Sequence, residues 1–259
     1  MHIAIVNDDG INAPGIHALA AAAKQFGKVS VIAPDRNRSV SGQHKTLGAP
    51  LRLDPVPFAE ADQAWVCDGS PSDCAACFGL GFVKDDPVDL LLSGVNPTPN
   101  LGMDLTYSGT VMAAVESSFW NVPSAAFSIQ CPRKRPSEID FSAIEHIVPV
   151  VVDYMTANPL PKNVSLNVNF PDLPWEKIKG FRVTFAGGRN YYDVLDRRVD
   201  PFGRPYYWFG GDAPSSICEE GSDGAALRDG YVSVTPIHMD LTKYSMLARM
   251  SAWDWNDRQ

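Results

Sequence analysis

The chain has 259 residues, 45% of them hydrophobic and 20% charged, and a formal net charge of -8. This composition is typical of a soluble globular protein, and the length suffices for one domain with a sizeable core. The acidic balance argues against binding to a nucleic-acid polymer or an anionic membrane, because both attract basic proteins. A small phosphorylated substrate remains compatible with it, since a bound divalent cation reverses the local field.

The first half of the chain predicts alternating strands and helices. Residues 2–6 form an apolar run typical of a buried strand, and a helix is expected between Asn12, as its N-cap, and Gly27, which ends it. A second strand is predicted over residues 29–33 and closed by Pro34. Short connections in this β–α–β order indicate parallel strands and a doubly wound sheet.

The same alternation continues to residue 170. Further strands are expected at 64–67, 88–92, 124–129 and 164–170, with a short strand or hairpin arm at 47–53. Helices are expected from Cys74 to about Val83, capped by Ser72 and Asp73, from about Thr110 to Trp120, and within the amphipathic stretch 141–155, which follows a break at Pro132 and Pro136. We therefore predict an α/β fold with a Rossmann-like, mostly parallel sheet.

After Pro171 the chain becomes aromatic and glycine-rich. Short strands of hairpin type are expected at 181–185, 206–209 and 231–235, and the tail from 251 to 259 is expected to be poorly ordered. We predict a single domain over 1–259, with an α/β core at 1–170 and a β-rich C-terminal extension at 171–259. Exposed hairpin arms often pair with a second subunit, so the extension is expected to build a homodimer or homotetramer.

Cysteine usage and the N-terminal segment bear on the compartment. The five cysteines are odd in number and scattered, unlike a disulfide framework. Cys74 and Cys77 lack a second C-x-x-C pair, so we interpret them as small core residues of a helix, with half a zinc site or a redox pair as alternatives. Charge appears too early for a secretory signal and no apolar run reaches ~18 residues, so a cytoplasmic protein is expected.

Polar residues follow several of the predicted strands. The carboxyl ends of parallel strands meet at one edge of a sheet, where α/β proteins hold their ligands. Two adjacent carboxylates repel each other unless a cation or a shared proton lies between them. Carboxylate, hydroxyl and amide oxygens together suit Mg²⁺ or Mn²⁺. The candidates at this edge are Asn7, Asp8, Asp9, Ser39, Ser41, His44, Asp68, Asn96 and Asn100.

A second candidate feature is Ser108-Gly109-Thr110, which stands directly before a predicted helix. Free backbone N–H groups at a helix start bind anions such as phosphate, and Gly109 would allow close approach of the backbone. A hard metal beside such a segment indicates phosphoryl-ester chemistry. The alternative is that Ser108 or Thr110 only caps its own helix, as Asp8-Asp9-Gly10 could form a simple turn.

Several stretches spread along the chain together form a recognisable pattern. They are NDDGINAPGI at 7–16, APDRNRS at 33–39, DGSPSDC at 68–74, SGVN at 93–96, NLGMDLTYSGTV at 100–111, LNVNFPDLP at 166–174, DPFGRPYYWFGG at 200–211 and GYVSVTPIHMDLT at 230–242. In these stretches the chain resembles the SurE family of survival-protein phosphatases, also described as 5'/3'-nucleotidases. The resemblance covers nearly the whole chain, and its combination of NDDG, APG and YSGTV is far more specific than a lone glycine motif.

The resemblance implies a metal-dependent phosphomonoesterase that acts on nucleoside monophosphates, with 3'-nucleotides and short polyphosphate as further substrates. It also implies dimers or tetramers formed through the C-terminal arms. In the family pattern, the ligands of one divalent ion, Mg²⁺ or Mn²⁺, correspond to Asp8, Asp9, Ser39 and Asn96. The catalytic residues correspond to Asp8 and Asp9, and the phosphate-binding residues correspond to Asn96, Ser108, Gly109 and Thr110.

Two loops depart from the family pattern. Family members usually have glycine where Thr98 stands in Asn96-Pro97-Thr98-Pro99-Asn100. This loop is expected to be stiffer, with an altered base preference or phosphate placement. The loop 39–44 also differs from the commoner version, which has smaller residues. Neither departure removes an expected metal ligand.

The implied mechanism is direct hydrolysis by a water activated by the metal, or by Asp8 or Asp9 as base. Asp8 as a phosphorylated nucleophile is the alternative. The fold class is also compatible with two other functions. A dinucleotide-binding oxidoreductase would need G-x-G-x-x-G where the chain has two acids. A non-catalytic nucleotide or metabolite sensor on the same scaffold is the other alternative.

Overall fold

The computed structural model describes residues 1–131 and 138–255. The break expected at Pro132 and Pro136 and the end of the expected flexible tail, 256–259, lie outside these residues. Within them a nine-stranded sheet has the order β3-β4-β2-β1-β5-β6-β7-β11-β8. Its strands are β1 (His2–Val6), β2 (Lys28–Pro34), β3 (Leu53–Pro55), β4 (Gln63–Cys67), β5 (Leu90–Asn96), β6 (Ser124–Gln130), β7 (Val164–Pro171), β8 (Phe181–Val183) and β11 (Val232–His238).

The centre of this sheet is parallel. β1 pairs in parallel with β2 and β5, and the parallel pairing continues to β4 on one side and through β6 to β7 on the other. β3 and β11 join in antiparallel fashion, to β4 and β7 respectively, and β8 pairs in parallel with β11. The predicted α/β fold with a mostly parallel, doubly wound sheet is confirmed.

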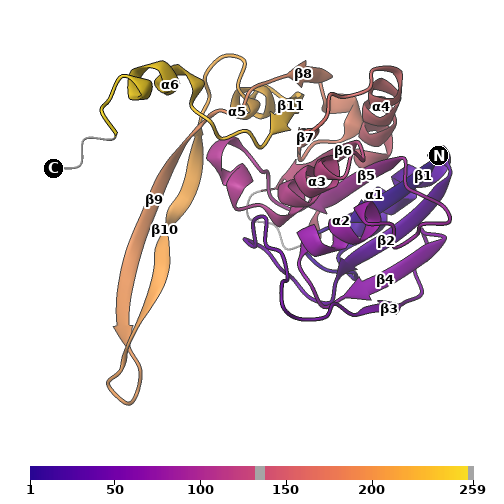
Figure 1. Cartoon of the computed structure of the whole chain (residues 1–259), viewed down its shortest axis with the longest axis horizontal. Coiled ribbons are helices and arrows are strands. Elements are labelled where there is room, and N and C mark those ends of the chain that lie inside the picture. Colours follow the sequence, from indigo (N-terminus) through magenta and orange to yellow (C-terminus); the bar gives the residue numbers. More distant parts are fainter. Residues whose placement is uncertain (132–137, 256–259) are drawn as a thin grey trace.

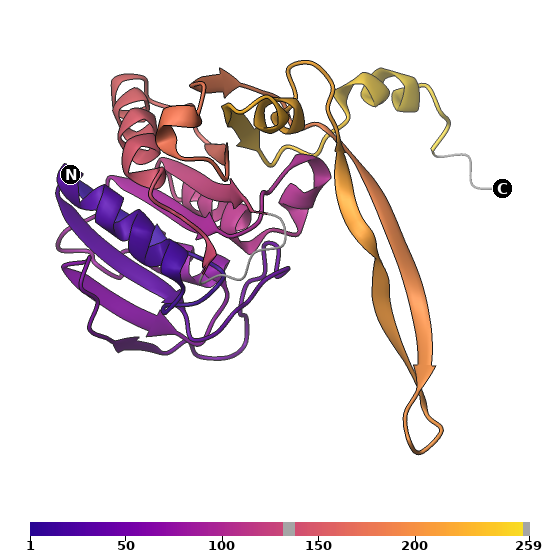
Figure 2. The same ribbon diagram turned by 180° about the vertical axis from the view of Figure 1, so that it is seen from behind.

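Helices cover both faces of the sheet, as Figures 1 and 2 show from opposite sides. Successive side chains of β1 point to opposite faces, so Ile3 and Ile5 belong to one core cluster, whereas Ala4 and Val6 belong to another. α1 (Pro14–Ala23) and α4 (Ile144–Ala157) cover the first face; α2 (Pro71–Gly79) and α3 (Gly109–Phe119) cover the second.

Two helices begin at other residues than the sequence predicted. The N-cap of α2 is Ser70, whose hydroxyl accepts a bond from the Asp73 backbone while the Asp73 side chain bonds back. The expected cap at Ser72 was therefore wrong. The N-cap of α1 is Ala13 and not Asn12. In both helices a proline occupies the first helical position, which suits its fixed φ and missing N–H.

The C-terminal region is built differently from the prediction. Residues 181–183 and 232–238 are not hairpin strands, because they join the main sheet as β8 and β11. The hairpin consists of the long strands β9 (Gly188–Val199) and β10 (Pro205–Ile217). We call residues 188–217 the arm. It projects away from the body of the molecule (Figure 1).

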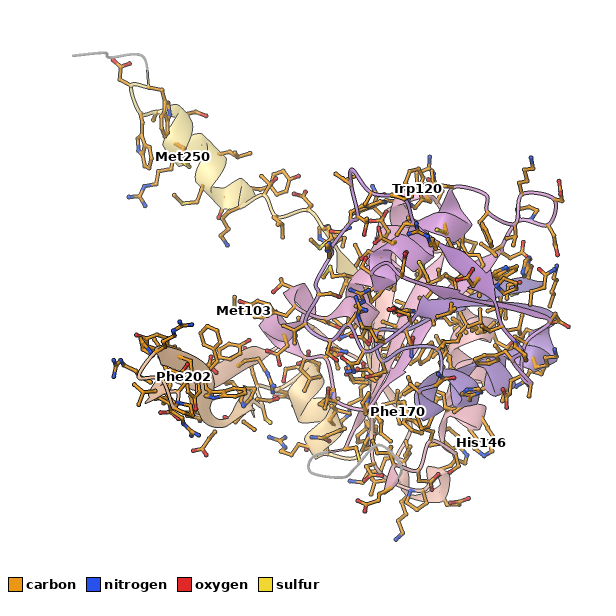
Figure 3. The ribbon with its side chains drawn as sticks, turned by 90° about the horizontal axis from the view of Figure 1, so that it is seen from below. Met103, Trp120, His146, Phe170, Phe202 and Met250 are labelled. Carbon is orange, nitrogen blue, oxygen red and sulfur yellow. The ribbon has the colours of Figure 1, made fainter. Side chains whose placement is uncertain are left out.

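Two short helices that the sequence did not predict follow the arm. α5 (Asp223–Arg228) lies against β11, and α6 (Tyr244–Ser251) stands clear of the body beyond the arm, as the position of Met250 shows in Figure 3. The division of the chain at residue 170 stays a prediction, although the main sheet extends beyond it. Within the described part of the chain, no helix is both long and apolar enough to cross a bilayer.

The C-x-x-C pair lies on α2, as expected. Cys74 is completely buried in the core, and Cys77 is half-buried beside it. Burial raises the pKa of the Cys77 thiol to about 11. Both cysteines are free thiols, and no group of three or more His, Cys, Asp or Glu side chains among the described residues could hold a metal ion. The burial of Cys74 in the core and the packing of Cys77 against it confirm the interpretation as core residues.

Candidate active site

The first turn after β1 is closed by Asn7. Its amide donates to the Gly10 carbonyl at 2.9 Å, and its Oδ1 accepts the Gly10 N–H at 3.3 Å. Gly10 adopts a φ of 101°, which a residue with a side chain rarely reaches. This turn fixes where Asp8 and Asp9 leave the sheet.

Asp8 is almost completely buried, at 4% exposure, against the start of α3. The Thr110 hydroxyl donates to its Oδ1 at 2.5 Å. Burial raises the pKa of Asp8, and this bond, together with the nearby backbone of Gly109 and Thr110, only partly offsets the rise. A Cβ atom at position 109 would stand 2.8 Å from the Asp8 Cβ, so the approach requires glycine.

Asp9 is half-buried and contacts the loop after β2. Its Oδ1 accepts a bond from the Asn37 amide at 3.1 Å, while Oδ1 of Asn37 accepts the Ser39 N–H at 2.8 Å. Burial, together with the neighbouring charge of Asp8, raises the pKa of Asp9 to about 7. Asn37 thus joins two expected metal ligands. This role of Asn37 was not predicted from the sequence, although Asn37 lies within the APDRNRS stretch.

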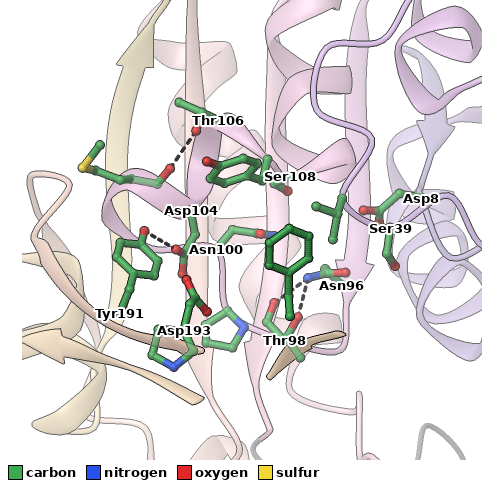
Figure 4. A pocket seen from close by; sticks show the side chains of 16 residues that line it. Asp8, Ser39, Asn96, Thr98, Asn100, Asp104, Thr106, Ser108, Tyr191 and Asp193 are labelled. Atoms are coloured by element: carbon green, nitrogen blue, oxygen red, sulfur yellow. Dashed lines mark hydrogen bonds between the residues drawn. The ribbon is translucent and has the colours of Figure 1, made fainter. Parts of the chain in front are cut away.

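A cavity of about 780 Å³ opens over these residues (Figure 4). It brings together Asp8, Ser39, Asn96 and Ser108 from four separate segments of the chain. Asp9 lines a smaller neighbouring cavity of about 190 Å³. The other lining residues of the large cavity are Val40, Thr98, Pro99, Asn100, Met103, Asp104, Thr106, Tyr107, Tyr191, Asp193, Phe209 and Pro214.

The residues at the start of α3 already have partners within the protein. The Ser108 hydroxyl accepts the Val111 N–H at 3.1 Å and so caps its own helix. Thr110 is fully buried, and Gly109 is buried against Asp8. Of the three, only Ser108 lines the cavity. Phosphate binding by this segment stays a prediction.

The loop that follows β5 is held at its far end. The Asn100 carbonyl accepts bonds from the amides of Asn167 and Asn169, at 2.9 and 3.0 Å. The Asn100 N–H donates to Oδ1 of Asn169, and the Asn100 amide donates to Ser128 Oγ, both at 2.8 Å. Asn100 is thus a structural anchor. Thr98 is not among the residues with positive φ, so the loop does not need glycine there.

The arm forms one wall of the cavity through Tyr191, Asp193 and Phe209. Its base is fixed to the body by Asp104. The Arg189 guanidinium pairs with Oδ2 of Asp104 at 2.7 Å, and the Tyr191 hydroxyl donates to Oδ1 at 2.6 Å. Burial, then the bond to this carboxylate, raises the pKa of Tyr191 to about 12.

The remaining candidates at the strand ends are Asp68, His44 and Ser41, and none of them lines the large cavity. Asp68 is exposed and bonds to the Arg52 N–H, and His44 is exposed. Ser41 Oγ is buried and has no hydrogen-bond partner among the residues that the structure describes, and it lies 2.9 Å from where a Cβ at Gly109 would stand. Val40 adopts a φ of 59°, a strained conformation for a β-branched residue.

The ligand atoms of the four expected residues determine which metal ion they could bind. Asp8, Asp9, Ser39 and Asn96 all offer oxygen ligands, and the negative charge of Asp8 helps to raise the pKa of Asp9. A hard divalent cation would relieve that repulsion, whereas zinc sites in proteins are built mainly from cysteine and histidine. The donor set is therefore compatible with Mg²⁺ or Mn²⁺.

Comparisons with known proteins agree with this picture. The family model described as survival protein SurE matches residues 3–193. A protein of Chloroflexus aggregans named 5'-nucleotidase SurE is 42% identical over 255 residues, which is 98% of this chain and 100% of that protein. One of the same name from Herpetosiphon aurantiacus is 41% identical over 257 residues, covering 99% and 100%. The crystal structure of a SurE protein from Aquifex aeolicus superposes with a TM-score of 0.82 at 38% identity, over 97% of this chain and 98% of the other.

Proposed function

Because this chain belongs to the SurE family, we propose that it hydrolyses nucleoside 5'-monophosphates to nucleoside and phosphate. The observation that carries the proposal is the convergence of Asp8, Ser39 and Asn96 on one cavity, although they stand far apart in the sequence. Relatives named as 5'-nucleotidases support the reaction class. We extend the proposal to 3'-nucleotides and short polyphosphate as further substrates.

One divalent cation, Mg²⁺ or Mn²⁺, would be held by Asp8, Asp9, Ser39 and Asn96. When bound, it would supply polarisation of the phosphoryl oxygens and a lowered pKa for a coordinated water. The oxygen-only donor set and the repulsion between the two acids support this assignment.

Side chains and backbone groups of the protein would orient the carboxylates, accept a proton and position the phosphate. Thr110 and the α3 backbone hold the Asp8 carboxylate in one orientation, as Asn37 does for Asp9. One of these two carboxylates would take the proton of the attacking water. Asn96, through the cation that it would hold, and the segment 108–110 would orient the phosphate for in-line attack.

A phosphorylated Asp8 is the alternative course of the reaction. In that case the Asp8 carboxylate attacks phosphorus as the bond from phosphorus to the nucleoside oxygen breaks, and the leaving oxygen takes a proton from the Asp9 carboxyl. Water then hydrolyses the acyl phosphate, which releases phosphate and restores the Asp8 carboxylate. Acid quenching during turnover of a nucleotide labelled in its phosphate distinguishes the two. Label bound to the wild-type protein and absent from Asp8→Asn would establish the nucleophile. Its absence from both supports direct hydrolysis.

We further propose that the arm assembles the chain into a homodimer or homotetramer. Large apolar side chains are exposed along both of its strands, among them Leu195, Trp208 and Phe209. An exposed two-stranded ribbon with such a surface gains stability by packing against another copy.

A panel of nucleotides with Mn²⁺ or Mg²⁺ tests the proposed reaction through phosphate release. Asp9→Asn should reduce the rate by orders of magnitude, and EDTA should abolish it in the wild type. Asp68→Asn is the matched control, because it alters an exposed acid at another strand end, outside the cavity. Full activity of Asp9→Asn, or of the EDTA-treated protein, would contradict the proposal. Nucleotide binding without phosphate release would favour the sensor.

A further inference from the structure

The side-chain amide of Asn96 is held by the residue two positions further along. Its Nδ2 donates to the Thr98 carbonyl at 2.6 Å and to the Thr98 hydroxyl at 3.0 Å. The amide nitrogen therefore faces Thr98. Figure 4 shows the nitrogen of Asn96 turned to Thr98, and its oxygen turned to the side where Ser39 and Asp8 lie.

We propose that Thr98 is a positioning residue that orients Asn96, so that its carbonyl oxygen and not its N–H groups faces the divalent cation. This inference rests on the proposed function, because it takes Asn96 as a ligand of that cation. A carboxamide is nearly symmetrical in shape, but only its oxygen can bind a cation. Rotation by half a turn would replace a ligand with two positively polarised hydrogens.

The loop around Thr98 is stiff enough for this task. Pro97 and Pro99 have their φ angles fixed by their rings, and each restricts the residue before it to extended conformations. The restricted residues are Asn96 and Thr98 themselves. The Asn100 anchor to β6 and β7 holds the far end of the loop. The two acceptors on Thr98 therefore stand at fixed positions relative to β5.

The two acceptors can be separated by mutation. The Thr98 carbonyl belongs to the backbone and persists in any variant, whereas the hydroxyl can be removed alone. Thr98 is exposed and outside the core, so its replacement should leave the fold intact. The β-branched Thr98→Val keeps the shape without the hydroxyl, and Thr98→Ser keeps the hydroxyl without the methyl group.

Mn²⁺ affinity, measured from the electron paramagnetic resonance of the free ion, tests the proposal without substrate. One lost hydrogen bond predicts an affinity about 3- to 10-fold lower in Thr98→Val. Thr98→Ser should bind within about twofold of the wild type. Equal affinities of Thr98→Val and the wild type would overturn the positioning role.

A double-mutant cycle tests whether Thr98 acts through Asn96. In an Asn96→Ala background, where no amide remains to orient, Thr98→Val should change Mn²⁺ affinity by less than about twofold. The same loss in both backgrounds would overturn the proposal, because Thr98 would then act by another route. Wild-type protein that binds no Mn²⁺ would overturn the proposed metal site itself. Wild-type binding with an unaffected Thr98→Val removes only the positioning role.

Discussion

The Thr110 hydroxyl donates a 2.5 Å hydrogen bond to the Asp8 carboxylate, across 102 positions of sequence. The backbone at the start of α3 lies beside the same carboxylate and lowers its pKa. A helix N-terminus favours negative charge, and here the anion it holds is a side chain of the protein itself. The segment expected to bind phosphate thus first fixes a proposed metal ligand.

Thr110→Val should disturb Asp8 while preserving the shape of the side chain. It removes a bond to a buried carboxylate, and the loss of such a supporting contact typically lowers metal affinity or activity by about 10- to 100-fold. Phosphate release and Mn²⁺ titration would measure the two effects. Thr110→Ser, which retains the hydroxyl, should remain near the wild type. Unchanged activity of Thr110→Val would show that the bond to Asp8 is dispensable.

Gly109→Ala should act at the same place through steric repulsion. The new Cβ would lie 2.8 Å from the Asp8 Cβ and 3.0 Å from its Oδ2, so the carboxylate must move. We expect a loss of activity of at least about 100-fold, since misplacement by about 1 Å can cost that much. Gly210→Ala on the arm is the matched control, because its Cβ would meet nothing closer than 3.7 Å. Comparable activity of both variants would contradict the steric argument.

The parallel part of the sheet could be predicted because apolar runs and short connections are local signals. The strands towards the edge of the sheet could not be predicted in this way. Residues 181–183 and 232–238 alternate as hairpin strands do, and only the pairing of β11 with β7, distant in sequence, decides their place. The two helix starts were missed for a shared reason. The residue directly before Pro14 or Pro71 becomes the cap, whichever polar residue stands nearby.

The part of the candidate site that is formed by the ends of the strands could be predicted from the sequence. Parallel strands deliver their carboxyl ends to one edge, so the gathering of Asp8, Ser39 and Asn96 follows from the fold class. The contacts that orient these residues do not follow from it. Those of Thr110 with Asp8 and of Asn37 with Asp9 depend on how loops distant in sequence pack together.

Asp73 links α2 to the loop that carries Ser39. Its carboxylate accepts the Ser70 N–H at 2.9 Å, the Thr46 N–H at 2.9 Å and the Thr46 hydroxyl at 2.7 Å. Burial by itself raises the pKa of Asp73, but these bonds together outweigh it, and the pKa is lowered below the ordinary 3.8. Folding is therefore favoured by the ionised form of this carboxyl.

Asp73→Asn should lower the free energy of unfolding by about 1–3 kcal/mol near pH 7, because it weakens bonds to a buried charge. The stabilisation by a carboxyl with a lowered pKa is complete above its unfolded pKa and disappears as pH falls through the folded one. The difference between wild type and variant should thus be constant at pH 5–7 and shrink below about pH 4. Urea unfolding across this range measures it. Asp85→Asn, at an exposed position, is the control, and a difference independent of pH would contradict the assignment.

The arm carries apolar side chains on both faces. Leu195 stands opposite Phe209 in the ladder, whereas the neighbouring Trp208 stands opposite Asp196 and projects from the other face. Leu195 and Trp208 are each 60% exposed. Burial of such a side chain against another copy contributes about 1.5–3 kcal/mol, so a few of them can hold an assembly together.

Replacing Leu195 and Trp208 together by glutamate places a charge on each face and should dissociate an assembly built through the arm. In light scattering after size-exclusion chromatography, the wild type should show two or four times the chain mass of 28.2 kDa. The double variant should show a smaller multiple or the single chain, because burial of an unpaired charge is strongly unfavourable. Val183→Glu, at an 82% exposed position on β8, should retain the wild-type mass. An unchanged mass of the double variant would show that the copies meet at another surface, and a wild type of 28.2 kDa would show that they do not assemble.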